Sequence, residues 1–487
     1  MAAGAFWLFL EKGGQQLSSF IVFTIIARLI GPEEYGFVAL SGVFISIATN
    51  IVNGLVDSVI SLRIKDDQRL STLFWIVMIC GAGISLVSYS AAASFAEIMG
   101  DTRIAPILRA FSAIPILLAL AAVPTVLVSA SMNFRVFTIR TLAASLISGV
   151  IGITLALKDF GAYALAIQQI ALFVIINIVV WPGCGWHPKL IFNIRAMTEP
   201  LRLGANQTMS ALVSSFQQQV PRLLLGYFIG PSAAGQYTFV MRIAASFQEI
   251  LVQPVVMVIY PAIALVRDNT EEQAKIMQQT VLLLGTLILP AIALTVQTAP
   301  LYIPLLFGEK WNETIPLMQL VLIATAPLAI GFVMRDYLRA HKLISSYFRL
   351  QFGLVLLELL LSAALVRQGL TVFVCVGVGV AFAAFAVYSM QVYAKTGIRL
   401  WQSYRRLWVS LAASLAAASV MQLFQIYRLY SANTMIQLTE SLLLGGVTYI
   451  AICGLFQRRQ IASLVQMVTK SRKGEAQKVE ILTQQKD

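Results

Sequence analysis

The chain of 487 residues carries little charge, since Asp, Glu, Lys and Arg together make up 12% of it, about half the share found in soluble domains. Hydrophobic residues make up 58%, and the mean hydropathy is +0.80. This composition excludes a water-soluble surface. In lipid, every backbone polar group must be satisfied internally, which leaves helices or a closed barrel. Apolar runs of about twenty residues favour helices.

Cysteine and histidine are also scarce. The cysteines are dispersed, and no pair has the spacing of a metal site or a disulfide: Cys80, Cys184, Cys375 and Cys453. The two histidines, His187 and His341, fall in predicted cytoplasmic loops. A Gly-rich phosphate loop of the nucleotide-hydrolysing kind is missing as well. We therefore expect no metal, no cofactor and no catalytic residue.

The hydropathy pattern predicts an all-α integral membrane protein of about 14 transmembrane helices. The first predicted span lacks a small-residue cleavage motif and is longer than the core of a signal peptide, so we interpret it as retained. The spans are expected near residues 5–29, 37–62, 72–95, 107–131, 138–157, 163–181, 205–229, 235–260, 277–303, 314–338, 344–366, 370–393, 405–425 and 434–456.

The distribution of Lys and Arg supports this count, because positive charge concentrates in cytoplasmic loops. With the first residue inside, the inner loops and the tail hold 24 of these cations. The outer loops hold five, namely Arg103, Lys158, Lys310, Arg367 and Arg428. Both termini are therefore predicted to be cytoplasmic. The net charge of +13 fits a basic face against anionic lipid and requires no nucleic acid.

An internal repeat organises the chain. Ile30, Gly31 and Pro32 are followed by Gly36, and the same pattern recurs 199 residues later, from Ile229 to Gly235. Six spans separate the copies, so the halves enter the membrane from the same side, as parallel repeats related by a pseudo-two-fold axis along the membrane normal. The predicted domains are an N-terminal six-helix bundle (1–200), a C-terminal six-helix bundle (201–397), two additional transmembrane helices (398–456) and a cytoplasmic polar tail (457–487).

Polar side chains cluster on the two spans that open each half. A polar or charged side chain inside a membrane span is costly, so its presence there indicates a functional or structural role. One predicted helix face of the span near 235–260 holds Arg242, Ser246, Glu249 and Gln253, at i, i+4, i+7 and i+11. The polar faces of these four spans are expected to meet over one central cavity. The substrate-binding candidates are Lys12, Arg222, Arg242, Asn50, Asn53, Asn206, Gln217 and Gln218, and the coupling-ion candidates are Asp57 and Glu249.

Structural roles compete with these interpretations. Lys12 and Glu11 lie near the predicted cytoplasmic end of their span, where the lysine can extend its charge to the headgroups. Arg222 lies near an outer end and has the same alternative. Arg242 and Glu249 alternatively form a buried ion pair that fixes their helix.

The sequence resembles the Wzx-like flippases, the polysaccharide transporter branch of the multidrug, oligosaccharidyl-lipid and polysaccharide exporter superfamily. The resemblance covers most of residues 4–456. The stretches that carry it are Gly4 to Trp7, Ala27 to Gly36, Met132 to Arg135, Gly161 to Leu165, Leu203 to Ala205 and Ile229 to Tyr237.

This resemblance implies two six-helix bundles, alternating access and a substrate of sugars on a polyprenyl diphosphate. Cations that offset phosphate charge are then expected at Lys12, Arg222 and Arg242, with amides such as Asn50 and Gln217 for sugar hydroxyls. The expected partners are the lipid-linked oligosaccharide and the bilayer, and a polysaccharide polymerase and a chain-length regulator are candidates. The transport unit is expected to be monomeric, in a bacterial inner membrane.

Three alternatives remain open. A cation-coupled multidrug exporter of the same superfamily would use acidic groups such as Asp57 and Glu249. A membrane-embedded polysaccharide polymerase or ligase would be an enzyme, and it needs a sizeable outer loop with catalytic residues, whereas the longest predicted outer loops, 96–106 and 304–313, are short and lack His. A flippase for a peptidoglycan precursor is a close variant of the main prediction.

Overall fold

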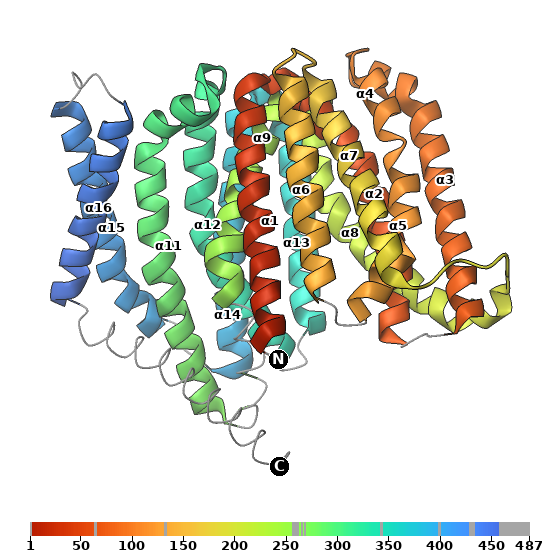
Figure 1. The fold of residues 1–487 in the computed structure, drawn as a ribbon. Coiled ribbons are helices and arrows are strands. Elements are labelled where there is room, and N and C mark those ends of the chain that lie inside the picture. Colours follow the sequence, from red (N-terminus) through yellow and green to blue (C-terminus); the bar gives the residue numbers. More distant parts are fainter. Residues whose placement is uncertain are drawn as a thin grey trace. The chain divides into compact units, whose positions relative to one another are not determined.

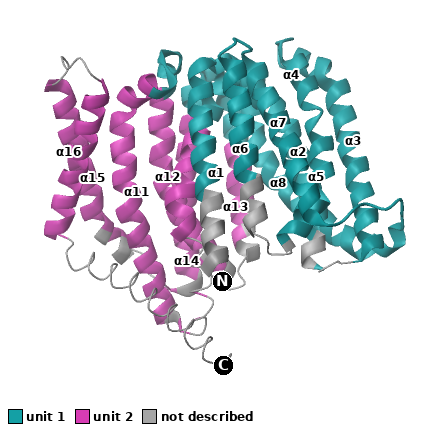
Figure 2. Ribbon diagram, in the orientation of Figure 1, with its two compact units in different colours: residues 1–239, 306–314, 359–373 teal, residues 240–305, 315–358, 374–487 magenta. Residues whose placement is uncertain are grey.

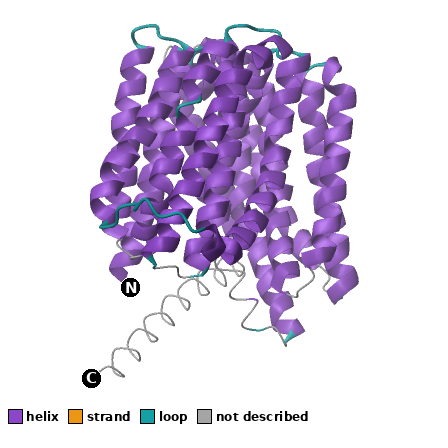
Figure 3. Ribbon diagram, turned by 90° about the vertical axis from the view of Figure 1, so that its right-hand side faces the viewer, coloured by secondary structure: helices purple, strands orange, loops and turns teal. Residues whose placement is uncertain are grey.

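The structure, a computed structural model, describes residues 2–62, 66–130, 134–255, 263, 266, 269–340, 344–397, 401–427 and 434–456. Within these residues all regular structure is helical (Figure 3). The predicted all-α class is therefore confirmed. Ten helices of the described residues are long and apolar enough to cross a membrane, by length and composition. A total of fourteen crossing helices stays a prediction.

The order of the helices follows the predicted spans (Figure 1). The first part of the chain forms α1 (Ala2–Leu29), α2 (Pro32–Ser61), α3 (Asp67–Ile98), α4 (Ile104–Phe111), α5 (Ile114–Ala130), α6 (Phe134–Ala156), α7 (Ala162–Cys184), η1 (Ile194–Met197), α8 (Thr198–Phe228) and α9 (Pro231–Phe247). The remainder forms η2 (Gln248–Val252), α11 (Thr270–Phe307), η3 (Glu309–Thr314), α12 (Ile315–Ala340), α13 (Ile344–Leu365), η4 (Val366–Gln368), α14 (Leu370–Thr396), α15 (Trp401–Tyr427) and α16 (Thr434–Phe456).

Two predicted spans differ from the structure in detail. The span near 107–131 is broken after Phe111 into α4 and α5, because Pro115 has no backbone N–H to donate to the carbonyl oxygen of Phe111, four residues earlier. The span near 235–260 changes from α9 to a π-helix at Gln248, and its last five residues lie outside the described part of the chain.

The chain divides into two compact units (Figure 2). Unit 1 takes in residues 1–239, 306–314 and 359–373, and unit 2 takes in residues 240–305, 315–358 and 374–487. The predicted domains with boundaries at 200, 397 and 456 stay a prediction. The predicted tail, 457–487, lies outside the described residues.

Unit 1 has cores on two sides of α2. One core joins α2 to α4, α7, α8 and the first turns of α9, and it includes Leu40, Leu108 and Leu225. The other joins α2 to α3, α5 and the segment after α7, and it includes Val52, Leu73 and Trp186. Both α2 and α3 contribute buried residues to the two cores and so connect them.

Trp311 of η3 ties the last turn of α1 to other elements of unit 1. Its side chain is 0% exposed, and its indole N–H donates a 2.8 Å hydrogen bond to the carbonyl oxygen of Ala27. The indole stacks on Phe239 at 4.0 Å between ring centroids and meets Tyr35 edge-on at 5.8 Å. A carbonyl at the helix end, which has no partner within the helix, is thereby satisfied.

The two copies of the Gly-Pro motif contact each other in unit 1. Pro32 begins α2 and Pro231 begins α9, so the 199-residue offset recurs at the helix starts. A Cβ atom on Gly36 would overlap the carbonyl oxygen of Pro231, and one on Gly235 would overlap that of Pro32. The contact is reciprocal, as a two-fold relation between the copies requires. Both glycines are needed for the close approach of the backbones.

In unit 2, α15 and α16 pack on each other and on α11. The Tyr449 hydroxyl donates a 2.7 Å hydrogen bond to the carbonyl oxygen of Thr286. Gly445 leaves room for Met421 of α15 and Leu294 of α11. The two helices that fall outside the sequence repeat are therefore integral to this unit.

Candidate functional site

The polar residues of unit 1 gather where α2 crosses α8. The backbones approach closely at two glycines. A Cβ on Gly54 would overlap Thr208, and one on Gly204 would lie 3.0 Å from the Cα of Leu55. Small residues at a helix crossing let side-chain hydrogen bonds form between helices in a membrane. We call the contact between these two helices the α2–α8 seam.

Four polar side chains form a continuous network in the α2–α8 seam. The Arg222 guanidinium donates through Nη1 to Oε1 of Gln219 at 3.0 Å. The Gln219 amide donates through Nε2 to the Ser46 hydroxyl at 3.0 Å. The hydroxyls of Ser46 and Ser215 lie 2.8 Å apart. Gln219 and Ser215 are 8% and 7% exposed, whereas Ser46 and Arg222 are partly exposed.

The direction of the hydrogen bonds in this network is fixed by chemistry. A guanidinium group has donors and no acceptor, so the oxygen of the Gln219 amide must face Arg222. The amide nitrogen then faces Ser46, whose hydroxyl accepts. One neutral side chain of α8 thus links the charge of Arg222 to α2.

Arg222 has no carboxylate partner among the residues that the structure describes. The ion pairs in this part of the chain are Arg103 with Glu33, Arg103 with Asp101, and Lys189 with Asp67. Its Nε atom is buried and has no hydrogen-bond partner there. A buried, unpaired guanidinium is costly, which favours a site that receives an anion.

The remaining candidates of unit 1 lie outside this network. Asn53, Asp57, Asn206 and Gln218 are exposed. Asn50 donates to the carbonyl oxygen of Ser46 within its own helix, at 2.8 Å. The structure does not bring these side chains into the network.

Asn206 and Gln217 lie away from the seam. Each is two residues from a residue of the α8 contact face, Thr208 or Ser215, which is just over half a helical turn. The spacing of Asn206, Ser210, Ser214 and Gln217 in the sequence predicts a single polar helix face. The face that contacts α2 contains Gly204, Thr208, Ser215 and Gln219 instead. Its spacing of four, seven and four residues was present in the sequence and was the available signal.

The candidates of unit 2 lie around the change from α9 to the π-helix η2. Arg242 and Glu249 are both exposed. Glu249 lies in η2, where the N–H of Gln253 bonds to the carbonyl oxygen of Gln248. A π-helical turn takes more residues than an α-helical turn and is frequent at functional sites. Arg242 and Gln253 therefore do not share one α-helical face, although their spacing in the sequence predicts that they do.

The Lys12 side chain lies outside the described residues. Its role as a substrate-binding residue stays a prediction, and so does a single cavity shared by the four polar spans. No group of three or more His, Cys, Asp or Glu side chains in the described part of the chain has the geometry of a metal site.

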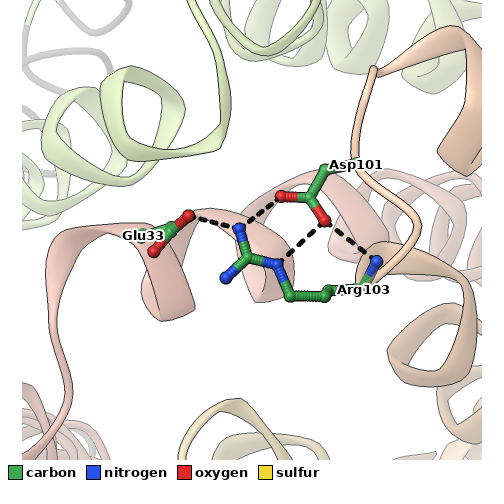
Figure 4. Close-up of polar contacts among 3 residues, drawn as sticks. All are labelled: Glu33, Asp101 and Arg103. Carbon is green, nitrogen blue, oxygen red and sulfur yellow. Dashed lines mark hydrogen bonds and ion pairs between the residues drawn. The ribbon is translucent and has the colours of Figure 1, made fainter.

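An exposed ion-pair cluster lies where α2 begins and α3 ends (Figure 4). The Arg103 guanidinium contacts Glu33 at 2.5 Å and Asp101 at 2.7 Å. Hydrogen bonds from Arg103 lower the pKa of the Asp101 carboxyl, and the pKa of Arg103 is raised by the same bonds. The sequence identified Arg103 as an outer-loop cation without these partners.

Similarity to solved structures defines the class of fold. The chain superposes on the structure described as lipid II flippase MurJ, inward closed conformation, with a TM-score of 0.75 and 13% identity. The superposition covers 95% of this chain and 100% of that one. The chain therefore has the same overall fold as this structure. The number of its helices that cross the membrane stays a prediction.

The chain belongs to the polysaccharide biosynthesis protein family, whose model matches residues 25–316. It is 22% identical over 334 residues to the lipopolysaccharide biosynthesis protein WzxC of Escherichia coli (strain K12), covering 67% of each chain. It is 21% identical over 334 residues to the succinoglycan biosynthesis transport protein ExoT of Rhizobium meliloti (strain 1021), covering 68% of each chain. The resemblance to Wzx-like polysaccharide transporters is confirmed.

Proposed function

We propose that this protein is a flippase that moves oligosaccharide repeat units, linked to a polyprenyl diphosphate, across a bacterial inner membrane. Such units are precursors of exopolysaccharide, capsule or O-antigen. The transport cycle is alternating access between two six-helix bundles, followed by two additional helices. Both termini are cytoplasmic, and the chain works as a monomer that delivers its product to a polymerase and a chain-length regulator.

The environment of Arg222 is the observation that carries this proposal. Its guanidinium is held by a neutral amide, its Nε lacks a partner among the described residues, and it lies in a helix whose sequence is predicted to span the membrane. A diphosphate offers the charge and the acceptor oxygens that such a guanidinium lacks. Arg pairs with phosphate in two parallel hydrogen bonds, which gives geometric selectivity as well as energy.

Family membership supports the same substrate class. One relative is named a succinoglycan biosynthesis transport protein, and the protein with the similar fold is named a lipid II flippase. Transport of a lipid-linked sugar therefore agrees with both names, and these relatives are transporters rather than enzymes. The exposed amides of α2 and α8, with Asn53 and Gln218 among them, are suited to sugar hydroxyls.

The experiment is flipping in proteoliposomes. A polyprenyl diphosphate that carries a fluorescent oligosaccharide is placed in both leaflets, and an added glycosidase removes the sugars that become accessible outside. Wild-type protein is expected to make the inner pool accessible, and Arg222→Gln to reduce the rate by about tenfold or more, because a hydrogen bond to a charged group contributes about 1.5–3 kcal/mol. Arg222→Lys, which keeps the charge but not the planar fork, is expected to be intermediate.

Arg109→Gln is the matched control. Arg109 is an exposed arginine on α4 whose guanidinium lies 5.8 Å from the centre of the Tyr89 ring. This change is expected to leave the rate unaltered. Equal rates for wild type and empty liposomes would overturn the proposal. Efflux of a cationic dye that depends on Asp57 or Glu249 would favour the multidrug exporter instead.

A further inference from the structure

The residue that holds Arg222 in the α2–α8 seam, Gln219, is uncharged, where a carboxylate would be the usual partner of a buried arginine. Gln219 is 8% exposed and contacts the Arg222 guanidinium directly, at 3.0 Å. A carboxylate at this distance would pair with the arginine and cancel its charge. An amide satisfies one guanidinium N–H and leaves the positive charge uncompensated.

We infer that Gln219 determines the specificity of the Arg222 site, because its neutral amide positions the guanidinium while keeping the charge available for an anionic substrate. This inference rests on the proposed function and identifies which residue makes the site selective for a phosphorylated glycolipid over a neutral one. Gln219 acts through Arg222 and is a positioning residue.

The position of the Gln219 amide is itself determined by α2. Its Nε2 donates to Ser46 at 3.0 Å, and Ser46 lies 2.8 Å from Ser215. The oxygen of the amide is consequently directed at Arg222, because a flipped amide would place two donor groups against each other. Both hydroxyls are uncharged, so no negative charge enters the network from either helix.

The Nε atom of Arg222 indicates what the site lacks. It is buried and has no hydrogen-bond partner among the described residues. Native proteins rarely leave a buried donor unsatisfied, and such groups suggest a role in ligand binding. A phosphate oxygen would satisfy Nε and offset the charge at the same time.

The test uses two substitutions at Gln219 that differ in charge or polarity but little in size. Gln219→Glu gives Arg222 an internal counter-ion and is expected to lower the affinity for undecaprenyl diphosphate by about tenfold. Its melting temperature is expected to stay equal or to rise, because an ion pair replaces a neutral hydrogen bond. Gln219→Leu leaves the Arg222 charge unpaired and removes the hydrogen bond that positions the guanidinium. It is therefore expected to lower both the affinity for the diphosphate and the melting temperature.

Binding is measured on full-length protein in nanodiscs, with undecaprenyl diphosphate and with the neutral undecaprenol as probes. Gln422→Glu, an exposed position on α15, introduces the same charge change elsewhere and is expected to leave both affinities unaltered. A drop in affinity for the diphosphate without a change for the alcohol separates a charge effect from a purely structural one.

The outcomes separate this inference from the proposed function. If wild type binds the diphosphate no better than the alcohol, the anionic substrate itself is wrong. If Arg222→Gln loses the preference for diphosphate and Gln219→Glu keeps it, the role of Gln219 is overturned while the function stands. If Gln219→Glu does not fold, Ser46→Ala is the deciding variant, because it removes the hydroxyl that accepts from the Gln219 amide. It is expected to lower the affinity for the diphosphate by a few fold. An unchanged affinity overturns the inference.

Discussion

At the residue scale, Trp311 connects a short 3-10 helix to the end of α1. The indole is fully buried and supplies the hydrogen-bond partner of Ala27. Trp311→Ala is expected to destabilise the protein by about 3–5 kcal/mol. Trp311→Phe keeps a ring against Phe239 and loses the N–H, so it is expected to fall between wild type and Trp311→Ala. Melting temperatures measured in detergent micelles give the order of stability of wild type and the two variants.

Trp408→Ala is the control for this series, because Trp408 is 61% exposed. Its melting temperature is expected to match that of wild type. If Trp311→Phe were as unstable as Trp311→Ala, the ring stacking would not contribute as described.

The ion-pair cluster of Arg103 predicts a pH dependence. The pKa of Asp101 is lowered by hydrogen bonds from Arg103, so the folded state binds the proton less readily than the unfolded state. The contribution to stability is present above the unfolded pKa, about 4, and is lost as the pH falls through the folded pKa. The melting temperature of wild type is therefore expected to exceed that of Asp101→Asn at neutral pH, with the difference shrinking below about pH 4.

Glu97→Gln provides the comparison for the pH series. Glu97 is exposed on the same helix end and makes none of the three ion pairs of the described residues. Its difference from wild type is expected to be small near neutral pH. A difference between wild type and Asp101→Asn that grows at low pH would contradict the assignment.

The sequence prediction named Arg222 but omitted Gln219, Ser46 and Ser215, the other members of the network in the α2–α8 seam. The pattern of polar residues in apolar spans pointed to Arg222 and to the amides of α8. It selected Gln217 and Gln218 and omitted Gln219, because three consecutive glutamines point in three directions around a helix and the sequence does not show which direction faces α2. Which of them meets Ser46 depends on how α2 and α8 are rotated against each other.

At the element scale, the crossing of α2 and α9 depends on two glycines. Gly36→Ala adds a Cβ that would overlap the carbonyl oxygen of Pro231, and neither backbone can move without shifting its helix. We expect a loss of stability of about 1–3 kcal/mol, the cost of overpacking a well-packed contact. Thermal melting and the amount of folded protein in the membrane measure this loss.

Gly42→Ala is the matched control on the same helix. Nothing lies within 4 Å of a Cβ built there, and alanine favours the helix relative to glycine by about 0.8–1 kcal/mol. This variant is expected to be as stable as wild type or slightly more stable. If Gly36→Ala and Gly42→Ala were equally stable, the close approach at Gly36 would not contribute to the stability of the fold.

The helices themselves were largely predictable, since apolar runs of about twenty residues form helices in a membrane. The boundaries that differed have local causes. Pro115 divides one span into α4 and α5, and the π-helix at Gln248 breaks a face that the α-helical period predicts. Hydropathy reports the average apolarity of a segment, so it does not detect either change in backbone geometry.

At the scale of the whole molecule, the charge distribution predicts the topology. Thr102 follows α3 and is exposed, and Leu190, 92% exposed, lies between α7 and η1. In a variant without native cysteines, Thr102→Cys is expected to react with an impermeant maleimide in spheroplasts. Leu190→Cys is expected to react only after the membrane is permeabilised.

The reverse pattern would place the termini outside and contradict the prediction from Lys and Arg. Labelling of both positions in intact spheroplasts would indicate an even number of crossings between them, where three are predicted. The reverse pattern would leave the fold intact, because the helices and their contacts within each unit do not depend on orientation.

The sequence by itself determined the membrane class, the helical segments, the repeat and the family, because each follows from composition or from local pattern. Tertiary structure alone decided that Trp311 completes the end of α1, that Gly36 meets Pro231, and that Gln219 joins Arg222 to Ser46. These contacts join residues far apart in the chain, and they depend on the rotation and separation of packed helices. Local periodicity fixes which side chains share a face, but only packing fixes what that face touches.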